Sequence, residues 1–209
     1  DVALILNGKP MEVNERLLAG FPIRIPALDV NAVGAGGGSI AWVDKDGLLK
    51  VGPQSAGAEP GPACYDKGGK SATVTDANVY LGRLNNKALL EGRMLIKETL
   101  ASKSIGEIAK QINLSKEETA IGIIKVACST MVKAIRSISV ERGYDPREFV
   151  LFVYGGAGAL HAIEVAKELG IKQIVIPPSP GILCAEGAMN SFLTNEFVQT
   201  VFPKLDEEG

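Results

Sequence analysis

The chain has 209 residues, 46% of them hydrophobic, which suits one substantial buried core and excludes an intrinsically disordered protein. Lys and Arg number 22 against 24 Asp and Glu, and a net charge of −2 offers no basic surface for nucleic acid. The cysteines at 64, 128 and 184 form no C-x-x-C motif, so structural zinc is not expected and a reducing compartment, the cytoplasm, is predicted. No run reaches roughly 18 apolar residues, so a membrane span is not expected.

The first residues are predicted to form antiparallel strands. Asn7-Gly8 lies between apolar runs and is typical of a type I′ turn, in which both central residues have positive φ. Residues 4–6 should therefore pair with residues 11–13. Residues 20–34 have an extended pattern interrupted by prolines, which indicates an edge or irregular strand.

A glycine triplet precedes a second hairpin. Gly36, Gly37 and Gly38 weaken a strand, so they indicate a bend that a ligand or another backbone approaches closely. Their N–H groups are suited to an anion, with the Ser39 hydroxyl as a further donor. The hairpin turns at Asp46-Gly47 and joins residues 40–43 to residues 48–51.

The middle of the chain begins with a long loop. Residues 53–70 are rich in Gly, Pro and Ala and predict an ordered loop of the functional kind. A short strand, a turn at Asp76 and a helical turn should follow, and residues 87–112 are expected to form two short helices. Ser115 and Glu118 have the spacing of a capping box and begin a long helix. Its apolar stripe is Ile121, Ile124, Cys128, Met131, Ile135 and Ile138.

The last third alternates between strand and helix. Residues 148–154 and 173–177 are apolar strands, and the helix predicted between them makes them a parallel pair joined by a crossover. A further helix is expected after residue 181. Hairpins followed by such units around one long helix predict an α/β domain with a mixed sheet, the layout of ribonuclease-H-like domains.

A second glycine bend lies between the first of these strands and its helix. The N–H groups at Gly155, Gly156 and Gly158, at the positive end of a helix, favour phosphate. The dinucleotide motif G-x-G-x-x-G is not met, since His161 stands at the third glycine position, so NAD binding is disfavoured. A nucleotide loop and a tight turn that needs positive φ both remain open.

The sole histidine allows several roles. His161 falls on the first helical turn, where it is either a packed, hydrogen-bonded residue or a general base. A cysteine hydrolase that uses Cys64 and His161 is a further alternative, although no third member of a triad can be named.

Four segments together resemble the hydantoinase A / oxoprolinase family. They are "LDVNAVGAGGGSIAWVDKDGLLKVGPQSAGAEPGPACY", "TVTDANVYLGRL", "ERGYDPREFVLFVYGGAGALHA" and "PPSPGILCAEG", in the family's order. The resemblance implies an actin-like ATPase, in which two ribonuclease-H-like domains face a nucleotide cleft. It also implies that ATP activates the carbonyl of a cyclic amide or imide, such as a hydantoin or 5-oxoproline, for ring-opening hydrolysis, whereas some relatives carboxylate ketones.

The resemblance also implies site residues, with ATP and Mg²⁺ or another divalent metal as cofactors. The nucleotide would be held by Asp1, as the last residue of the second phosphate loop, by Gly36, Gly37, Gly38 and Ser39, and by an adenosine loop of Gly155, Gly156, Ala157 and Gly158. Catalytic roles fall to Asp29, Asp76 and His161, with Asp76 as the metal ligand. Asp76 is equally well explained as a helix N-cap. Ala159 replaces the family's usual proline.

The family's first phosphate loop is not found in this sequence. We therefore expect residues 1–209 to be a single domain, the second half of an ATPase core with an insertion at about 53–112, and a fragment of a longer protein that is inactive alone. The expected partners are a cyclic amide substrate, the first ATPase domain and a hydantoinase B-type subunit or domain, with no nucleic acid and no membrane. A ketone carboxylase subunit and a non-catalytic actin-like scaffold are the alternatives.

Overall fold

The first 31 residues form short antiparallel strand pairs. The structure is a computed structural model and describes residues 1–18, 20–192, 197 and 199. The pairs are β1 (Val2–Ala3) with β8 (Val30–Asn31), β2 (Ile5–Leu6) with β3 (Lys9–Pro10), β4 (Glu12–Val13) with β7 (Ala27–Leu28), and β5 (Arg16–Leu18) with β6 (Phe21–Ile23). We call residues 1–31 the N-terminal ribbon.

The predicted turn at Asn7-Gly8 is confirmed, with φ of 52° and 77° at its two residues. The register differs in part from the prediction. Leu4 accepts a hydrogen bond from the Met11 N–H at 3.1 Å, but the strand paired with β2 is β3, and Val13 pairs with Ala27 of β7. The turn therefore sets only the nearest pairs.

A longer hairpin follows and is confirmed. Strands β9 (Ser39–Val43) and β10 (Leu49–Ser55) pair antiparallel about the predicted Asp46-Gly47 turn, where Gly47 has a φ of 79°. The 3₁₀ helix η1 (Ala63–Tyr65) lies in the Gly/Pro-rich loop.

The turn predicted at Asp76 is instead the first turn of helix α1 (Val74–Tyr80). Thr73 is its N-cap, and Asp76 is the third helical residue that completes a capping box. The N-cap role predicted for Asp76 is therefore wrong. Thr73 and Asp76 carry the spacing of a capping box in the sequence, and that signal was overlooked.

The two short helices predicted over residues 87–112 are corrected to a hairpin and one helix. The elements are β11 (Ala88–Leu89), η2 (Leu90–Gly92), β12 (Met94–Leu95) and α2 (Glu98–Ile112). A helix cannot pass through residues 90–92, because Leu90, Glu91 and Gly92 all have positive φ. Helix α2 buries Ala101, Ile105 and Ala109 and ends at Asn113 in the left-handed conformation.

The predicted long helix is α3 (Lys116–Ile138), and its capping box of Ser115 and Glu118 is confirmed. Its core face is Ala120, Ile123, Ile124, Ala127, Cys128 and Val132, whereas Ile121 of the predicted stripe is exposed. The 3₁₀ helices η3 (Val140–Arg142) and η4 (Pro146–Glu148) follow it.

The predicted parallel pair is confirmed as β13 (Val150–Phe152) and β14 (Gln173–Val175). Between them lie η5 (Gly158–Leu160) and α4 (Ala162–Leu169), which ends at Gly170 with a φ of 71°. The last described elements are η6 (Pro180–Ile182) and α5 (Leu183–Met189).

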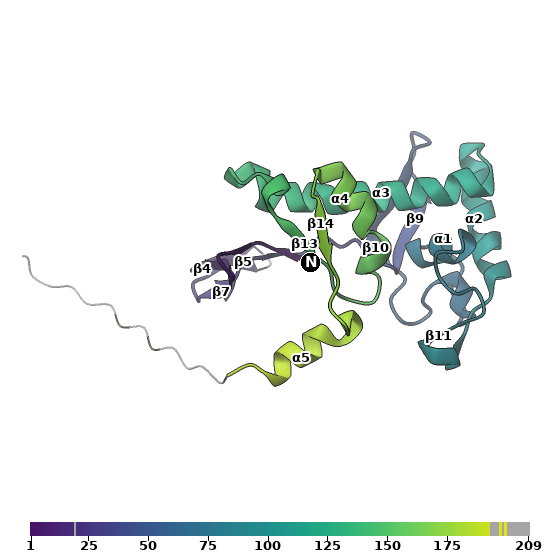
Figure 1. The fold of residues 1–209 in the computed structure, drawn as a ribbon. Helices are drawn as coiled ribbons and strands as arrows, with labels where there is room; N and C mark the ends of the chain where they lie inside the picture. Colours follow the sequence, from purple (N-terminus) through teal and green to yellow (C-terminus); the bar gives the residue numbers. More distant parts are fainter. Residues whose placement is uncertain (19, 193–196, 198, 200–209) are drawn as a thin grey trace, which may run out of the picture.

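The chain is an α/β protein whose core gathers around α3. Helices α1, α2 and α4 and the hairpin β9–β10 all pack against α3, and the N-terminal ribbon lies at the opposite end of α3 from α1 and α2 (Figure 1). In the described ranges the strands form separate two-stranded sheets, so the predicted mixed sheet is not seen. Within the same ranges, no helix has the length and apolar character needed to cross a bilayer.

Candidate functional site

Backbone hydrogen bonds from two other segments hold the carbonyl groups of the bend at Gly36–Ser39. Gly37 accepts a hydrogen bond from the Thr75 N–H and Gly38 from the Ala56 N–H, both at 2.8 Å. The Gly37 and Gly38 N–H groups have no acceptor among the described residues. These two donors are available to a ligand.

Ser39 closes this bend. Its hydroxyl oxygen accepts the Gly36 N–H at 2.9 Å, and its own N–H donates to the Gly36 carbonyl at 3.0 Å. The side chain is only 4% exposed. The hydroxyl donates to the Gly34 carbonyl at 3.4 Å, so it already has an acceptor within the turn, and its role as a further donor to an anion stays a prediction.

Steric crowding within the fold also explains why positions 37 and 38 are glycines. A Cβ on Gly37 would lie 2.7 Å from Thr75 Oγ1, and one on Gly38 would lie 2.9 Å from Ser55 Oγ. Side chains at these positions clash with the fold before any ligand is considered.

The second bend combines a turn that requires glycine with free N–H donors. Gly155 has a φ of 90°, and its N–H donates to the Pro180 carbonyl at 2.7 Å. The N–H groups of Gly156, Ala157 and Gly158 have no acceptor in the described part of the chain. The tight-turn interpretation is confirmed for Gly155, and it leaves the other three amides free for an anion.

The two bends meet although they are far apart in the sequence. A Cβ on Gly37 would lie 3.8 Å from the Cβ of Ala157. Unpaired N–H groups from both bends are therefore brought into one region. Consecutive N–H groups of this kind bind anionic groups such as phosphates. A hollow of about 360 Å³ lined by Tyr80, Leu81, Glu98 and Glu117 lies elsewhere and includes neither bend.

His161 lies directly beyond the second bend and is buried, with 1% exposure. Its Nδ1 is 3.6 Å from the Cys128 sulfur on α3, and no described group is bonded to its Nε2. Burial lowers the pKa of His161, while Glu164 acts in the opposite direction. These contacts favour a neutral packed imidazole, and its catalytic role stays a prediction.

The cysteine hydrolase alternative is contradicted by the structure. Cys64 is fully buried in a separate cluster with Val79, Ile96 and Ala101, and the thiol that contacts His161 belongs to Cys128. Burial raises the pKa of the Cys64 thiol far above its usual range, and nearby Asp76 adds to the shift. A nucleophilic cysteine needs the opposite change.

Asp76 is fully buried and accepts hydrogen bonds at both carboxylate oxygens. The donors are the N–H groups of Ala63 (3.2 Å), Cys64 (2.8 Å) and Thr73 (2.9 Å) and the Thr73 hydroxyl (2.7 Å). They tie η1 to the start of α1. Among the described residues no three His, Cys, Asp or Glu side chains gather as metal ligands, so the metal role of Asp76 stays a prediction.

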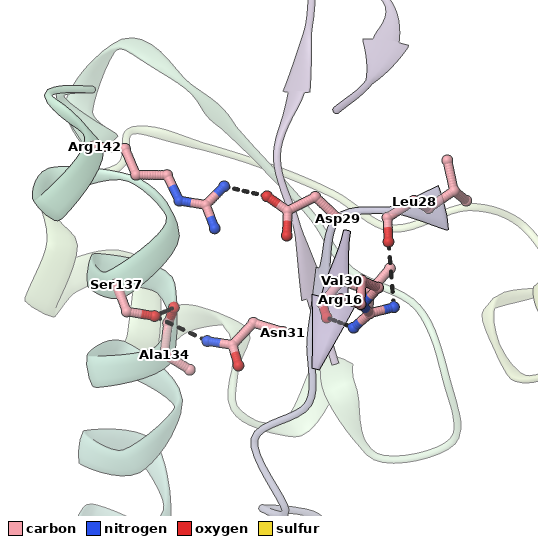
Figure 2. Close-up of polar contacts among 8 residues, drawn as sticks. All are labelled: Arg16, Leu28, Asp29, Val30, Asn31, Ala134, Ser137 and Arg142. Atoms are coloured by element: carbon pink, nitrogen blue, oxygen red, sulfur yellow. Dashed lines mark hydrogen bonds and ion pairs between the residues drawn. The ribbon is translucent and has the colours of Figure 1, made fainter. Parts of the chain in front are cut away.

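Asp29 connects the N-terminal ribbon to η3, which follows α3. Its carboxylate forms an ion pair with Arg142, and Asn31 Nδ2 donates to Ser137 Oγ at 2.8 Å (Figure 2). Arg16 binds the carbonyl of Val30 at 2.8 Å within the ribbon. Asp1 is exposed ahead of β1, and no described contact joins Asp1 or Asp29 to the glycine bends. The sequence analysis did not identify Thr75 or Arg142. Each contacts a residue far away in the sequence, Gly37 and Asp29 respectively.

The chain is similar to known proteins in both sequence and structure. The caprolactamase subunit alpha of Pseudomonas jessenii is 42% identical over 209 residues, which is 100% of this chain and 30% of the relative. The crystal structure of the ATP-dependent caprolactamase of that organism matches with a TM-score of 0.78 and 45% identity, over 84% of this chain and 26% of the other. A nucleotide-free acetone carboxylase structure matches with a TM-score of 0.79 and 31% identity, over 86% and 26%.

These matches agree with the motifs in the sequence. The chain spans less than a third of the length of these relatives. The model of the hydantoinase/oxoprolinase family matches residues 1–197, which include both glycine bends and Asp76. Because that match covers nearly the whole sequence, the chain belongs to the hydantoinase/oxoprolinase family.

Proposed function

We propose that this chain is the ATP-binding part of an ATP-dependent enzyme that opens a cyclic amide or imide by hydrolysis. The observation that carries the proposal is the meeting of two glycine bends whose N–H groups at Gly37, Gly38, Gly156, Ala157 and Gly158 have no acceptor in the described chain. Such donors match the oxygens of a triphosphate. The ribonuclease-H-like topology of the actin-like ATPases is part of the same proposal.

The residues of this chain would bind and orient the nucleotide. The amides of the two bends donate to phosphate oxygens, and the fixed turns at Ser39 and Gly155 hold those amides in place before the ligand arrives. When bound, ATP supplies the phosphoryl group that makes the carbonyl carbon of the ring a better electrophile for water. Mg²⁺ or another divalent ion is proposed to enter with the nucleotide, and the roles predicted for Asp1, Asp29 and Asp76 stay predictions.

The proposal includes further parts of the protein. A first ATPase domain would face these bends across the nucleotide, and a hydantoinase B-type subunit or domain would complete the enzyme in the cytoplasm. The relative from Pseudomonas jessenii is named a subunit, which supports an assembly of more than one chain.

Calorimetric titration of the complete protein with the ATP analogue AMP-PNP and Mg²⁺ tests this function. Gly156→Ala adds a methyl group where nothing lies within 4 Å and φ is not positive, so the fold tolerates it. We expect the affinity for AMP-PNP to fall roughly tenfold, a loss of about 1.4 kcal/mol, with the melting temperature unchanged. Gly187→Ala on α5, also with open space, is the matched control and should bind normally. Unchanged affinity in Gly156→Ala would contradict the proposed site. Absence of AMP-PNP binding by the wild-type protein would favour the scaffold alternative.

A ketone carboxylase is the second candidate, favoured by the similarity to acetone carboxylase. Incubating the complete protein with ATP and either lactams, hydantoins or ketones with bicarbonate separates the two. Ring opening without bicarbonate supports the hydrolase, and bicarbonate-dependent consumption of ketone supports the carboxylase.

A further inference from the structure

Thr75 packs against the first glycine bend from the side of α1. Its N–H donates to the Gly37 carbonyl at 2.8 Å, and its Oγ1 occupies the space into which a Cβ on Gly37 would project, at 2.7 Å. The side chain is 7% exposed. Thr75 therefore fixes the position of Gly37 by both a hydrogen bond and direct packing.

The second bend also lies against Gly37. The Cβ of Ala157 lies 3.8 Å from the position of a Cβ on Gly37. The next residue, Gly38, is backed by Ser55 in the same way. The bend consequently has little freedom to move toward or away from the adenosine loop.

The support behind Thr75 is rigid. Thr75 lies between the two capping-box residues of α1, and Asp76 ties that turn to η1 through the Ala63 and Cys64 N–H groups. The Thr75 residue is 7% exposed, so its hydroxyl has little room to move away from Gly37. The buried Asp76 network thus reaches the glycine bend through a single neighbouring residue.

We propose that Thr75 is a positioning residue for the nucleotide, which holds the Gly37 and Gly38 amides at the correct distance from the amides of the second bend. This inference rests on the proposed nucleotide-binding function. It assigns Thr75 no contact with the ligand. It predicts that the steric fit between positions 37 and 75 controls nucleotide affinity.

A double-mutant cycle on the complete protein tests the fit, with AMP-PNP and Mg²⁺ as the probe. Gly37→Ala places its methyl against Thr75 Oγ1 and should weaken binding roughly tenfold or more, or about 1.4 kcal/mol. Thr75→Ala should weaken it only about threefold, because it loosens the bend without a clash. Because Thr75→Ala removes the atom that clashes, the double variant should bind as well as Thr75→Ala alone and better than Gly37→Ala.

The control keeps the same bend but has no clash to relieve. A Cβ on Gly36 meets nothing within 4 Å, so Gly36→Ala should show no coupling to Thr75→Ala. Thr75→Ser keeps the Oγ1 atom that lies against Gly37 and loses only the γ-methyl group, so it should retain wild-type affinity. A role that depended on the volume of the whole side chain would not require this. All affinities are measured below the melting temperature of the least stable variant.

Each outcome decides the matter. If the wild type binds AMP-PNP and the double variant binds as weakly as Gly37→Ala, the role of Thr75 is overturned and the proposed function is not. Absence of AMP-PNP binding in the wild type overturns the proposed function and this inference with it. If Gly37→Ala does not fold, Thr75→Ala and Thr75→Ser still decide, because the proposal requires weaker binding in the first and normal binding in the second.

Discussion

Among single residues, Asp76 has a structural role that the fold shows directly, while its catalytic and metal-binding roles stay predictions. An acidic residue in a distinctive motif invites a metal or catalytic role. In the structure its carboxylate is fully buried and accepts four hydrogen bonds, which offset the cost of removing its charge from water. Thr75, the residue before Asp76 in α1, donates its N–H to the Gly37 carbonyl of the glycine bend.

The buried His161 leads to a prediction about how the folding stability depends on pH. Burial lowers the pKa of His161, so the fold favours the neutral ring, whereas the unfolded chain takes up a proton near the ordinary pKa of about 6.5. Stability should be constant with respect to this group above that pH and fall as the pH drops below it, by at most about 1.4 kcal/mol per pH unit. Urea unfolding at several pH values checks this.

The control removes the titrating group. In His161→Gln the part of the slope below about pH 6.5 that His161 contributes should disappear. The chain has one histidine, so the ring signal in a proton NMR titration belongs to it without further assignment. A measured pKa at or above the ordinary value contradicts the buried neutral state.

At the level of elements, the ion pair of Asp29 and Arg142 joins the N-terminal ribbon to η3, the 3₁₀ helix that follows α3. The side chain of Asp29 is 14% exposed and that of Arg142 37%, so solvent screens the pair only in part. Arg142→Met should cost roughly 1 kcal/mol or less and speed amide hydrogen exchange in β1 and β8. Arg24→Met is the matched control, because its pair with Glu15 is exposed at both ends, at 82% and 50%. Equal protection of β1 and β8 in the two variants would show that the ion pair does not hold the ribbon.

Local signals in the sequence predicted the elements better than their assembly. The turns at Asn7-Gly8 and Asp46-Gly47, the cap at Ser115 and the parallel pair were confirmed, since each depends on neighbouring residues. The hairpin at residues 88–95 was missed because three consecutive positive φ values leave little trace in an apolar pattern.

Distant contacts gave no signal in a single sequence. The glycine bends were recognised as candidate sites, but the side chains that shape them were not. Thr75 reaches Gly37 from another element, and Arg142 reaches Asp29 across 113 positions. Pairings of this kind depend on how α1 and η3 pack against the rest of the fold, which the local pattern of residues does not specify.

For the whole molecule, the two bends provide the dipoles of their peptide groups. Among the described residues, the nearest side chains to the Gly37, Gly38 and Gly158 positions are those of Thr75, Ser55, Ala157 and Val153, all of them uncharged. Phosphoryl transfer requires cationic groups or metal ions around the γ-phosphate, and amides on one side supply only part of that stabilisation. The remaining charge is expected from the proposed first ATPase domain.

The 209-residue chain mixed with ATP and Mg²⁺ should therefore release phosphate no faster than buffer. The complete protein, given a lactam or hydantoin that it accepts, should release phosphate in step with ring opening. A chain carrying Gly156→Ala serves as the blank, because any turnover that it shares with the wild-type chain does not come from these bends. Turnover by the wild-type chain alone that Gly156→Ala abolishes would mean that the bends act without a second domain, and the two-sided arrangement would have to be abandoned.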